Sequence, residues 1–293
     1  MRFGLLGPLE IVDGAGAPVD VGGHQPRTLL AVLLVAAGRA VSVDAIVDAI
    51  WGEEPPASAT GTLQSYVSRL RRRIGDQTSL VWDDAGYRLD VPPTAVDHLR
   101  FQSLTETGRQ LLADGRYAEA SDTFRDADAL WRGPALVEFL DRDFARSIAT
   151  RLEEQRVVAI EDRIDADLRL GRHANLVGEL TELVQAHPLR ESLRRHLALA
   201  LYRSGRQAEA LRALADAART LRDELGIEPS RPLRELESAI PAKTPRSTSH
   251  HSPRRPRTRL RLPRRRQPRL TSRRRAPQQP RPRAPHQGSR RSR

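Results

Sequence analysis

The chain has 293 residues and a formal net charge of +12 at pH 7, from 49 Lys and Arg against 37 Asp and Glu. Residues 241–293 hold eighteen Arg, one Lys and no acid, a net +19, which leaves residues 1–240 at −7. The chain has no cysteine, which excludes disulfides and thiolate metal sites, and its one lysine, Lys243, lies in the basic segment. P-loop nucleotide chemistry and lysine-based covalent catalysis are thereby excluded.

The length predicts one large or two ordinary domains. The N-terminus lacks the layout of a signal peptide, and the longest apolar run, residues 29–37, is too short to span a bilayer. We therefore expect a soluble protein with no membrane partner, and the missing cysteines fit the cytoplasm.

Residues 1–22 are predicted to form a small antiparallel sheet. The turn residues Gly7-Pro8 and Asp13-Gly14 separate three short β-rich runs, at residues 3–6, 9–12 and 19–21. A buried helix follows, because the stretch between Pro26 and Gly38 is apolar nearly all round. Ser42 is predicted to cap a second helix over residues 43–51.

After the loop at residues 52–57 (GEEPPA), the sequence predicts a basic amphipathic helix over residues 58–75. Its apolar stripe is Leu63, Val67, Leu70 and Ile74. The remaining faces carry hydroxyls and arginines and no acid: Ser65, Tyr66, Ser68, Arg69, Arg71, Arg72 and Arg73. Such a helix suits the DNA major groove, since arginine reads guanine or holds phosphate. The alternative is an ordinary amphipathic helix with a solvated basic face.

Two strand-like runs, residues 80–82 and 87–91, then flank Asp83-Asp84-Ala85-Gly86 and predict a hairpin. The order of strands, two helices, basic helix and hairpin is that of a winged helix-turn-helix, with the basic helix in the recognition position. The predicted fold class is therefore an α+β winged helix-turn-helix over residues 1–92.

Residues 97–240 are predicted to form an all-α, tetratricopeptide-like array of helix hairpins. A Gly-Arg motif recurs at Gly115, Gly171 and Gly205, and the last two lie 34 residues apart, the tetratricopeptide period. The alanines that follow the motif are expected to allow close helix packing: Ala118, Ala174 and Ala208. Residues 241–293, rich in Arg and Pro, are expected to be disordered and to bind polyanions without specificity, or to have no role.

Residues 1–92 resemble the OmpR-type winged helix, a phosphorelay-like output domain, in GLLGPLE, TLQSYVSRLRRRIG and AGYRLDV. Residues 97–240 resemble the bacterial transcriptional activation domain in LWRGPAL, HPLRESL and ALYRSGRQAEALR. Together they resemble the Streptomyces antibiotic regulatory protein family. The resemblance implies a transcriptional activator of an antibiotic or other secondary-metabolite gene cluster. It also implies paired protomers on promoter direct repeats and a contact with RNA polymerase.

By that resemblance, residues of the basic helix and the hairpin contact DNA: Thr62, Ser65, Tyr66, Ser68, Arg69, Arg71, Arg72, Arg73 and Arg88. Tyr66 has the alternative of packing, and Arg73 that of pairing with Asp76. The loop with Glu53 and Glu54 resembles a polymerase-contacting loop, with a plain turn as its alternative.

The sequence departs from the OmpR-type pattern at two places. Asp83 and Asp84 stand near the hairpin tip, where an arginine often enters the minor groove, and Gly61 has no side chain for DNA. The rival interpretation is a tetratricopeptide interaction scaffold with a degenerate winged helix. An enzyme is not expected, because no metal-ligand spacing or nucleophile elbow occurs, and no cofactor is expected.

Overall fold

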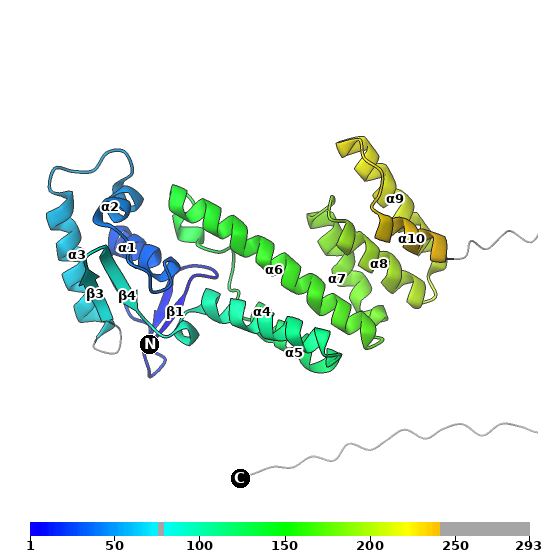
Figure 1. Cartoon of the computed structure of the whole chain (residues 1–293), viewed down its shortest axis with the longest axis horizontal. Helices are drawn as coiled ribbons and strands as arrows, with labels where there is room; N and C mark the ends of the chain where they lie inside the picture. The colour runs from blue at the N-terminus through cyan, green and yellow to red at the C-terminus, as the bar shows by residue number, and fades with distance from the viewer. Residues whose placement is uncertain (76–78, 241–293) are drawn as a thin grey trace, which may run out of the picture. The chain divides into compact units, whose positions relative to one another are not determined.

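The structure, a computed structural model, describes residues 1–75 and 79–240 (Figure 1). The basic segment 241–293, with its expected disorder, and the Asp76 partner expected for Arg73 lie outside the described residues. The described residues belong to one compact unit. The predicted fold class of a winged helix followed by a helical array is confirmed for the described part of the chain.

Strands β1 (Arg2–Gly4) and β2 (Glu10–Val12) pair antiparallel, with Phe3 opposite Ile11. The prediction of a third strand at residues 19–21 was wrong. In the described residues an isolated bridge from Val12 to Pro18 continues the pairing, flanked by two hydrogen bonds of 2.9 Å, from Asp13 N to Ala17 O and from Val19 N to Ile11 O. Val12 and Pro18 form a non-hydrogen-bonded pair, in which the bonds are made by their neighbours, so a proline is tolerated there, but the pairing does not extend into a strand at residues 19–21.

Three helices follow the sheet: α1 (His24–Val35), α2 (Val43–Trp51) and α3 (Ala59–Ile74). The buried side of α1 is continuous from Thr28 to Leu34, as its apolar sequence predicted. Ser42 caps α2, since its Oγ accepts the Ala45 N–H at 3.2 Å. All four residues of the predicted apolar stripe on α3 are buried in the same core as α1.

The predicted hairpin is formed by β3 (Ser79–Asp83) and β4 (Gly86–Asp90), with Asp83 opposite Gly86 across a two-residue turn. Val41 joins β4 as a bridge partner of Tyr87, through hydrogen bonds of 2.8 and 2.9 Å. Gly86 has a φ of +137°, and a Cβ there would overlap the carbonyl oxygen of Val41. Glycine is therefore required where the chain from α1 to α2 passes the wing.

The helical array begins after the short 3-10 turn η1 (Pro93–Ala95) and contains a second, η2 (Val137–Phe139). Its helices in the described residues are α4 (Asp97–Ala113), α5 (Tyr117–Asp128), α6 (Asp143–Arg169), α7 (His173–Ala186), α8 (Glu191–Arg203), α9 (Gln207–Leu225) and α10 (Arg231–Ala239). Smaller clusters of buried residues hold α6 to α8 together and α8 to α10 together, which is the nearest-neighbour stacking of a repeat array.

The repeated Gly-Arg motif marks three equivalent helix corners. Gly115, Gly171 and Gly205 have φ values of +75°, +77° and +77°. The N–H of the following arginine donates to the carbonyl five residues earlier, as Arg116 N does to Leu111 O at 2.9 Å. This is the Schellman arrangement, in which a left-handed glycine ends the helix. The predicted repeat thus marks the ends of α4, α6 and α8.

The alanines expected to pack between these helices are in fact exposed: Ala118, Ala174 and Ala208. Because α5, α7 and α9 each begin one residue earlier, these alanines lie in the first turn on the outward side. The buried position is two residues further along, at Ala120, Leu176 and Ala210.

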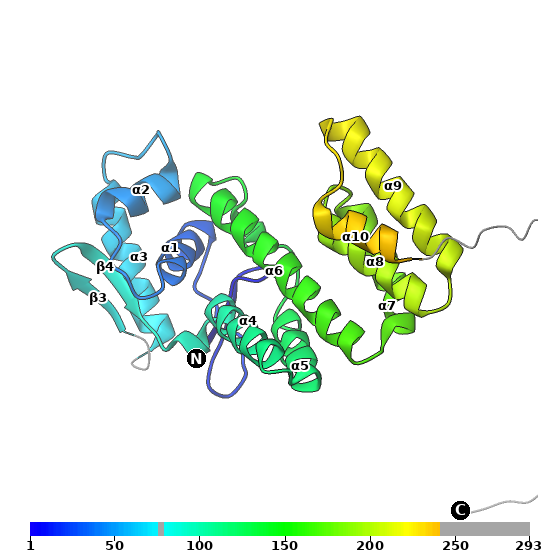
Figure 2. The same ribbon diagram turned by 45° about the vertical axis from the view of Figure 1, so that its right-hand side comes forward.

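One hydrophobic core spans the N-terminal sheet, the three-helix unit and the first half of the array, from Phe3 to Ala166. Figures 1 and 2 both show β1 beside the start of α4, where Phe3 bridges Val96 in parallel. The loop between β1 and β2 is closed by the segment after α5: Leu136 N donates to Leu5 O at 2.9 Å.

Charged side chains fix the same junction. The Asp97 carboxylate accepts the N–H groups of Leu5 and Leu6 at 2.8 and 2.9 Å and pairs with Arg132 at 3.1 Å. Glu138 accepts Leu9 N at 2.7 Å and pairs with Arg27 of α1 at 2.7 Å. The winged helix and the array are therefore joined by packing and hydrogen bonds as well as by the chain.

Candidate nucleic-acid interface

The exposed side of α3 carries only hydroxyl, amide, small and cationic residues. Its apolar side is anchored in the core, so the exposed side is turned outward as a consequence of packing. The exposed members of the predicted DNA-contacting set are Ser65, Ser68, Arg69, Arg71, Arg72 and Arg73, while Thr62 is partly exposed. Arg71, Arg72 and Arg73 occupy the last turn, where cations also favour the negative end of the helix dipole.

Tyr66 occupies the packing position that the sequence left as its alternative. Its side chain is buried at 8% exposure, and its hydroxyl donates to Oε1 of Gln25. The ring stacks on Trp51 with centroids 6.2 Å apart and lies beneath the guanidinium of Arg69, 4.9 Å from the ring centre. Tyr66 thus joins α1, α2 and α3 and holds Arg69 in place on the exposed side.

Arg71 is tied to the wing. Its Nε donates to the carbonyl oxygen of Leu80 in β3 at 2.8 Å, so its side chain links α3 to the hairpin. Arg88 stands opposite Val81 in the hairpin and is partly exposed, with a buried Nε that has no hydrogen-bond partner in the described structure. Neither arginine lies on the central exposed stripe of α3.

A basic depression lies along the other edge of α3. It has a volume of about 470 Å³ and is lined by Val21, Gly22, Arg69, Arg72 and Arg73. No ion pair is recorded for these three arginines in the described part of the chain, so their charge faces solvent. Sequence reasoning missed the contribution of residues 21–22, because nothing local connects that loop with a helix forty residues later.

The wing tip differs in character from α3. Asp83 accepts the N–H of Ala85 at 2.9 Å and so stabilises the turn, while Asp84 is exposed. Trp82 is 56% exposed and makes an edge contact with Tyr87, with ring centroids 5.0 Å apart. The sequence pattern indicated only a strand position for Trp82. Trp82 lies two residues after buried Leu80, so it is on the same face of the hairpin but beyond the end of the core.

The loop between α2 and α3 leaves Glu53 and Glu54 exposed. Gly52, with a φ of +66°, ends α2, and its N–H donates to Asp48 O at 2.7 Å. The loop presents two exposed carboxylates ahead of the N-terminal end of α3, and the helices at both ends of the loop set its position.

Among the described residues, no group of three or more His, Asp or Glu side chains is arranged to hold a metal ion. None of the helices described has the length and apolar character that a membrane crossing requires.

Comparison with known proteins agrees with this architecture. Residues 22–89 match the family "transcriptional regulatory protein, C terminal", and residues 96–241 match the "bacterial transcriptional activator domain". The chain is 40% identical over 250 residues to the regulatory protein DnrI of Streptomyces peucetius, covering 82% of this chain and 92% of DnrI. It is 43% identical over 241 residues to the regulatory protein AfsR of Streptomyces coelicolor, covering 82% of this chain but only 24% of AfsR.

A solved structure is also similar: Mycobacterium tuberculosis EmbR in complex with a low-affinity phosphopeptide. It superposes with a TM-score of 0.76 at 37% identity, covering 82% of this chain and 64% of EmbR. The fold and these matches define a transcriptional regulator with a winged helix and a bacterial transcriptional activator domain. The chain belongs to the Streptomyces antibiotic regulatory protein family. Its relatives are transcriptional regulators, which confirms the prediction that it is not an enzyme.

Proposed function

We propose that the chain binds specific promoter DNA through the exposed side of α3 and activates transcription there, in an antibiotic or other secondary-metabolite gene cluster. One observation carries the proposal. All the charged residues of α3 are arginines, and the helix is anchored by its buried apolar side. A cationic, acid-free helix face held rigidly by the core is what entry into a major groove requires.

The candidate residues are proposed to contact DNA in different ways. Ser65, Ser68 and Arg72 occupy the centre of the exposed side and are assigned to base edges. Arg69 and Arg73 border the basic depression beside residues 21–22 and are assigned to phosphates. Thr62, near the start of α3, is assigned to a phosphate at the helix N-terminus.

The remaining candidates support this surface. Tyr66 orients Arg69, and Arg71 fixes the wing against α3 through Leu80. Arg88 stays the candidate for DNA contact by the wing, although the exposed Asp84 at the tip opposes a close approach to phosphate.

Gel-shift titration tests the proposal, with residues 1–240 used to remove the nonspecific affinity of the basic segment. The double variant Arg69→Ala, Arg72→Ala is expected to lose specific binding, since one base contact is worth about 1–3 kcal/mol. Arg73→Ala should lower the slope of log K against log salt by about 1. The matched control is Arg212→Ala with Arg234→Ala, two exposed arginines of the array. Unchanged binding by the first pair would reject the assignment of α3.

We propose that two protomers bind a direct repeat, because linkage of two weak sites raises affinity through effective concentration. The acidic wing tip and Gly61 both predict weak binding by a single protomer. Footprinting of a selected operator should show two half-sites protected together. Saturating protection of one half-site alone would reject the pairing.

We propose that the exposed loop with Glu53 and Glu54 contacts RNA polymerase. The variant Glu53→Ala, Glu54→Ala should keep DNA affinity and lose activation in a purified transcription reaction. Asp223→Ala with Glu224→Ala, two exposed acids of α9, is the matched control. Equal activation by both variants would reject the loop as the contact.

The proposed division is a DNA-binding domain at 1–92, an activation domain at 97–240 and a disordered segment at 241–293. The family matches at 22–89 and 96–241 support the first two. The scaffold alternative is favoured by the acidic wing tip alone, and the gel-shift pair above separates it from DNA binding.

A further inference from the structure

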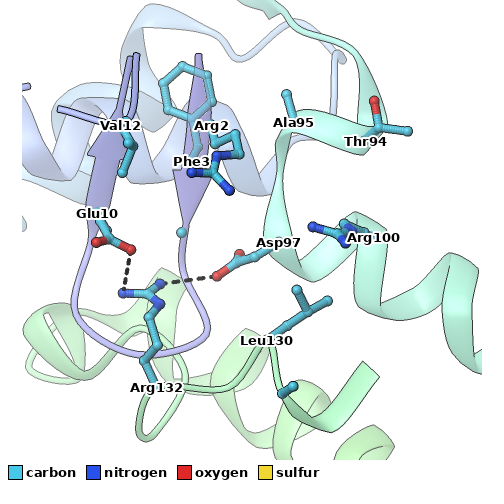
Figure 3. Close-up of a pocket in the computed structure, with 13 residues that line it drawn as sticks. Arg2, Phe3, Glu10, Val12, Thr94, Ala95, Asp97, Arg100, Leu130 and Arg132 are labelled. Atoms are coloured by element: carbon cyan, nitrogen blue, oxygen red, sulfur yellow. Dashed lines mark hydrogen bonds and ion pairs between the residues drawn. The ribbon is translucent and has the colours of Figure 1, made fainter. Parts of the chain in front are cut away.

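A cavity of about 330 Å³ lies where β1 and β2 meet the start of α4 (Figure 3). Its lining comes from three stretches far apart in the sequence: the N-terminal sheet, the η1–α4 segment and the segment after α5. Neither α3 nor the wing contributes to it. The cavity is therefore separate from the proposed DNA-binding surface, and an inference about it stands or fails independently.

Three guanidinium groups and two carboxylates line this cavity. Arg132 is neutralised, because it pairs with Asp97 at 3.1 Å and with Glu10 at 3.4 Å, as the dashed lines in Figure 3 mark. Arg2 and Arg100 have no ion pair recorded with any described residue. Two guanidinium groups without an ion pair among the described residues thus line the same cavity, one from β1 and one from α4, and both residues are exposed.

Asp97, one of the two acids of the cavity, cannot supply a missing partner; the other, Glu10, pairs with Arg132 at 3.4 Å. Both oxygens of Asp97 already accept N–H groups, from Leu5, Leu6 and His98, in addition to the pair with Arg132. These bonds hold the Asp97 carboxylate in place between the β1–β2 loop and α4. A pair of free guanidinium groups above a saturated carboxylate favours an added anion over rearrangement of the protein.

We propose that this cavity binds a compact dianion, a small dicarboxylate or a phosphate monoester, between Arg2 and Arg100. Each guanidinium presents paired N–H donors that match the oxygens of a carboxylate or phosphate. The volume is at the lower end of small-molecule sites. Leu130 in the lining, which is partly exposed, provides apolar surface for a short carbon skeleton between the charged ends. Bound there, the ligand bridges the N-terminal sheet and the helical array and stabilises their junction.

Titration calorimetry and thermal unfolding of the full chain test this, with succinate and inorganic phosphate as separate probes at constant ionic strength. The double variant Arg2→Gln, Arg100→Gln is expected to bind at least tenfold more weakly than the wild type and to lose the increase in Tm. The control Arg212→Gln with Arg234→Gln removes the same charge from α9 and α10 and should bind like the wild type. Residues 241–293 are present in every form, so any anion binding by them cancels.

A second variant separates the cavity from surface attraction. Ala95→Leu keeps every charge but fills part of the lining, and it should also weaken binding at least tenfold. Binding of succinate alone identifies a carboxylate site, and binding of phosphate alone identifies a phosphate site; both support the proposal. Wild-type affinity in the Arg2, Arg100 variant, or in Ala95→Leu, overturns it, as does a Tm no higher than in chloride.

Discussion

Replacing Asp97 by alanine should destabilise the whole described unit. The Asp97 side chain is 12% exposed and accepts the N–H groups of Leu5 and Leu6, two residues that are fully buried. A buried N–H left without a partner costs about 1–3 kcal/mol, so two of them cost about 4 kcal/mol. Asp97→Asn keeps one acceptor oxygen and should cost about 2 kcal/mol.

The matched control is Glu10→Ala. Glu10 contacts the same Arg132, at 3.4 Å, but its side chain is 52% exposed. An exposed ion pair contributes about 0–1 kcal/mol, and the two alanine variants change the net charge equally. Urea unfolding followed by circular dichroism gives the free energy of unfolding of each variant. A difference between them below about 1 kcal/mol would refute the conclusion that Asp97 fastens the β1–β2 loop to α4.

Two further predictions concern the wing and the response to pH. Gly86→Ala should lower the free energy of unfolding by more than about 2 kcal/mol, because the new Cβ would overlap Val41 and the φ of residue 86 is +137°. The control Gly14→Ala, whose Cβ would meet no atom within 4 Å, should lower it by less than about 1 kcal/mol. Equal Tm values for the two variants would contradict this prediction. Burial lowers the pKa of both His98 and His196 to about 4, below the ordinary 6.5. Between pH 6.5 and pH 4 these histidines are therefore protonated in the unfolded chain but neutral in the folded chain. The free energy of unfolding should fall over this range as the pH drops, by about 3 kcal/mol per histidine. Urea unfolding between pH 7 and pH 4.5 measures the slope, and an unchanged slope in His98→Gln would show that His98 does not contribute.

The parts of the fold that sequence reasoning predicted are those with a local signal. The apolar stripe on α3, the hairpin around Gly86 and the Gly-Arg corners each follow from residues within a few positions of one another. The failures have local causes too. The β propensity of residues 19–21 predicted a strand where only an isolated bridge forms, and Ala118 lies two residues too early in its helix to be buried.

The junction was not predictable in this way. The contacts of Leu5 with Asp97 and of Leu9 with Glu138 join residues 92 and 129 positions apart. No periodicity in the sequence points from one to the other, and an acid at the start of a helix has an ordinary local explanation. The same is true of the candidate site: the exposed arginines of α3 were identified from the pattern, but the packing of Tyr66 on Trp51 required the fold.

The shared core has a practical consequence for dissecting the protein. A fragment that stops at residue 92 would keep α3 intact but lose Val96, Asp97, Arg132 and Glu138, and so would present Phe3, Leu5 and Leu6 bare to water. Such a fragment should aggregate through this apolar surface and be poorly soluble. Aggregation of the isolated fragment would then result from the lost contacts between the winged helix and the array. It would not measure the affinity of the intact protein for its operator.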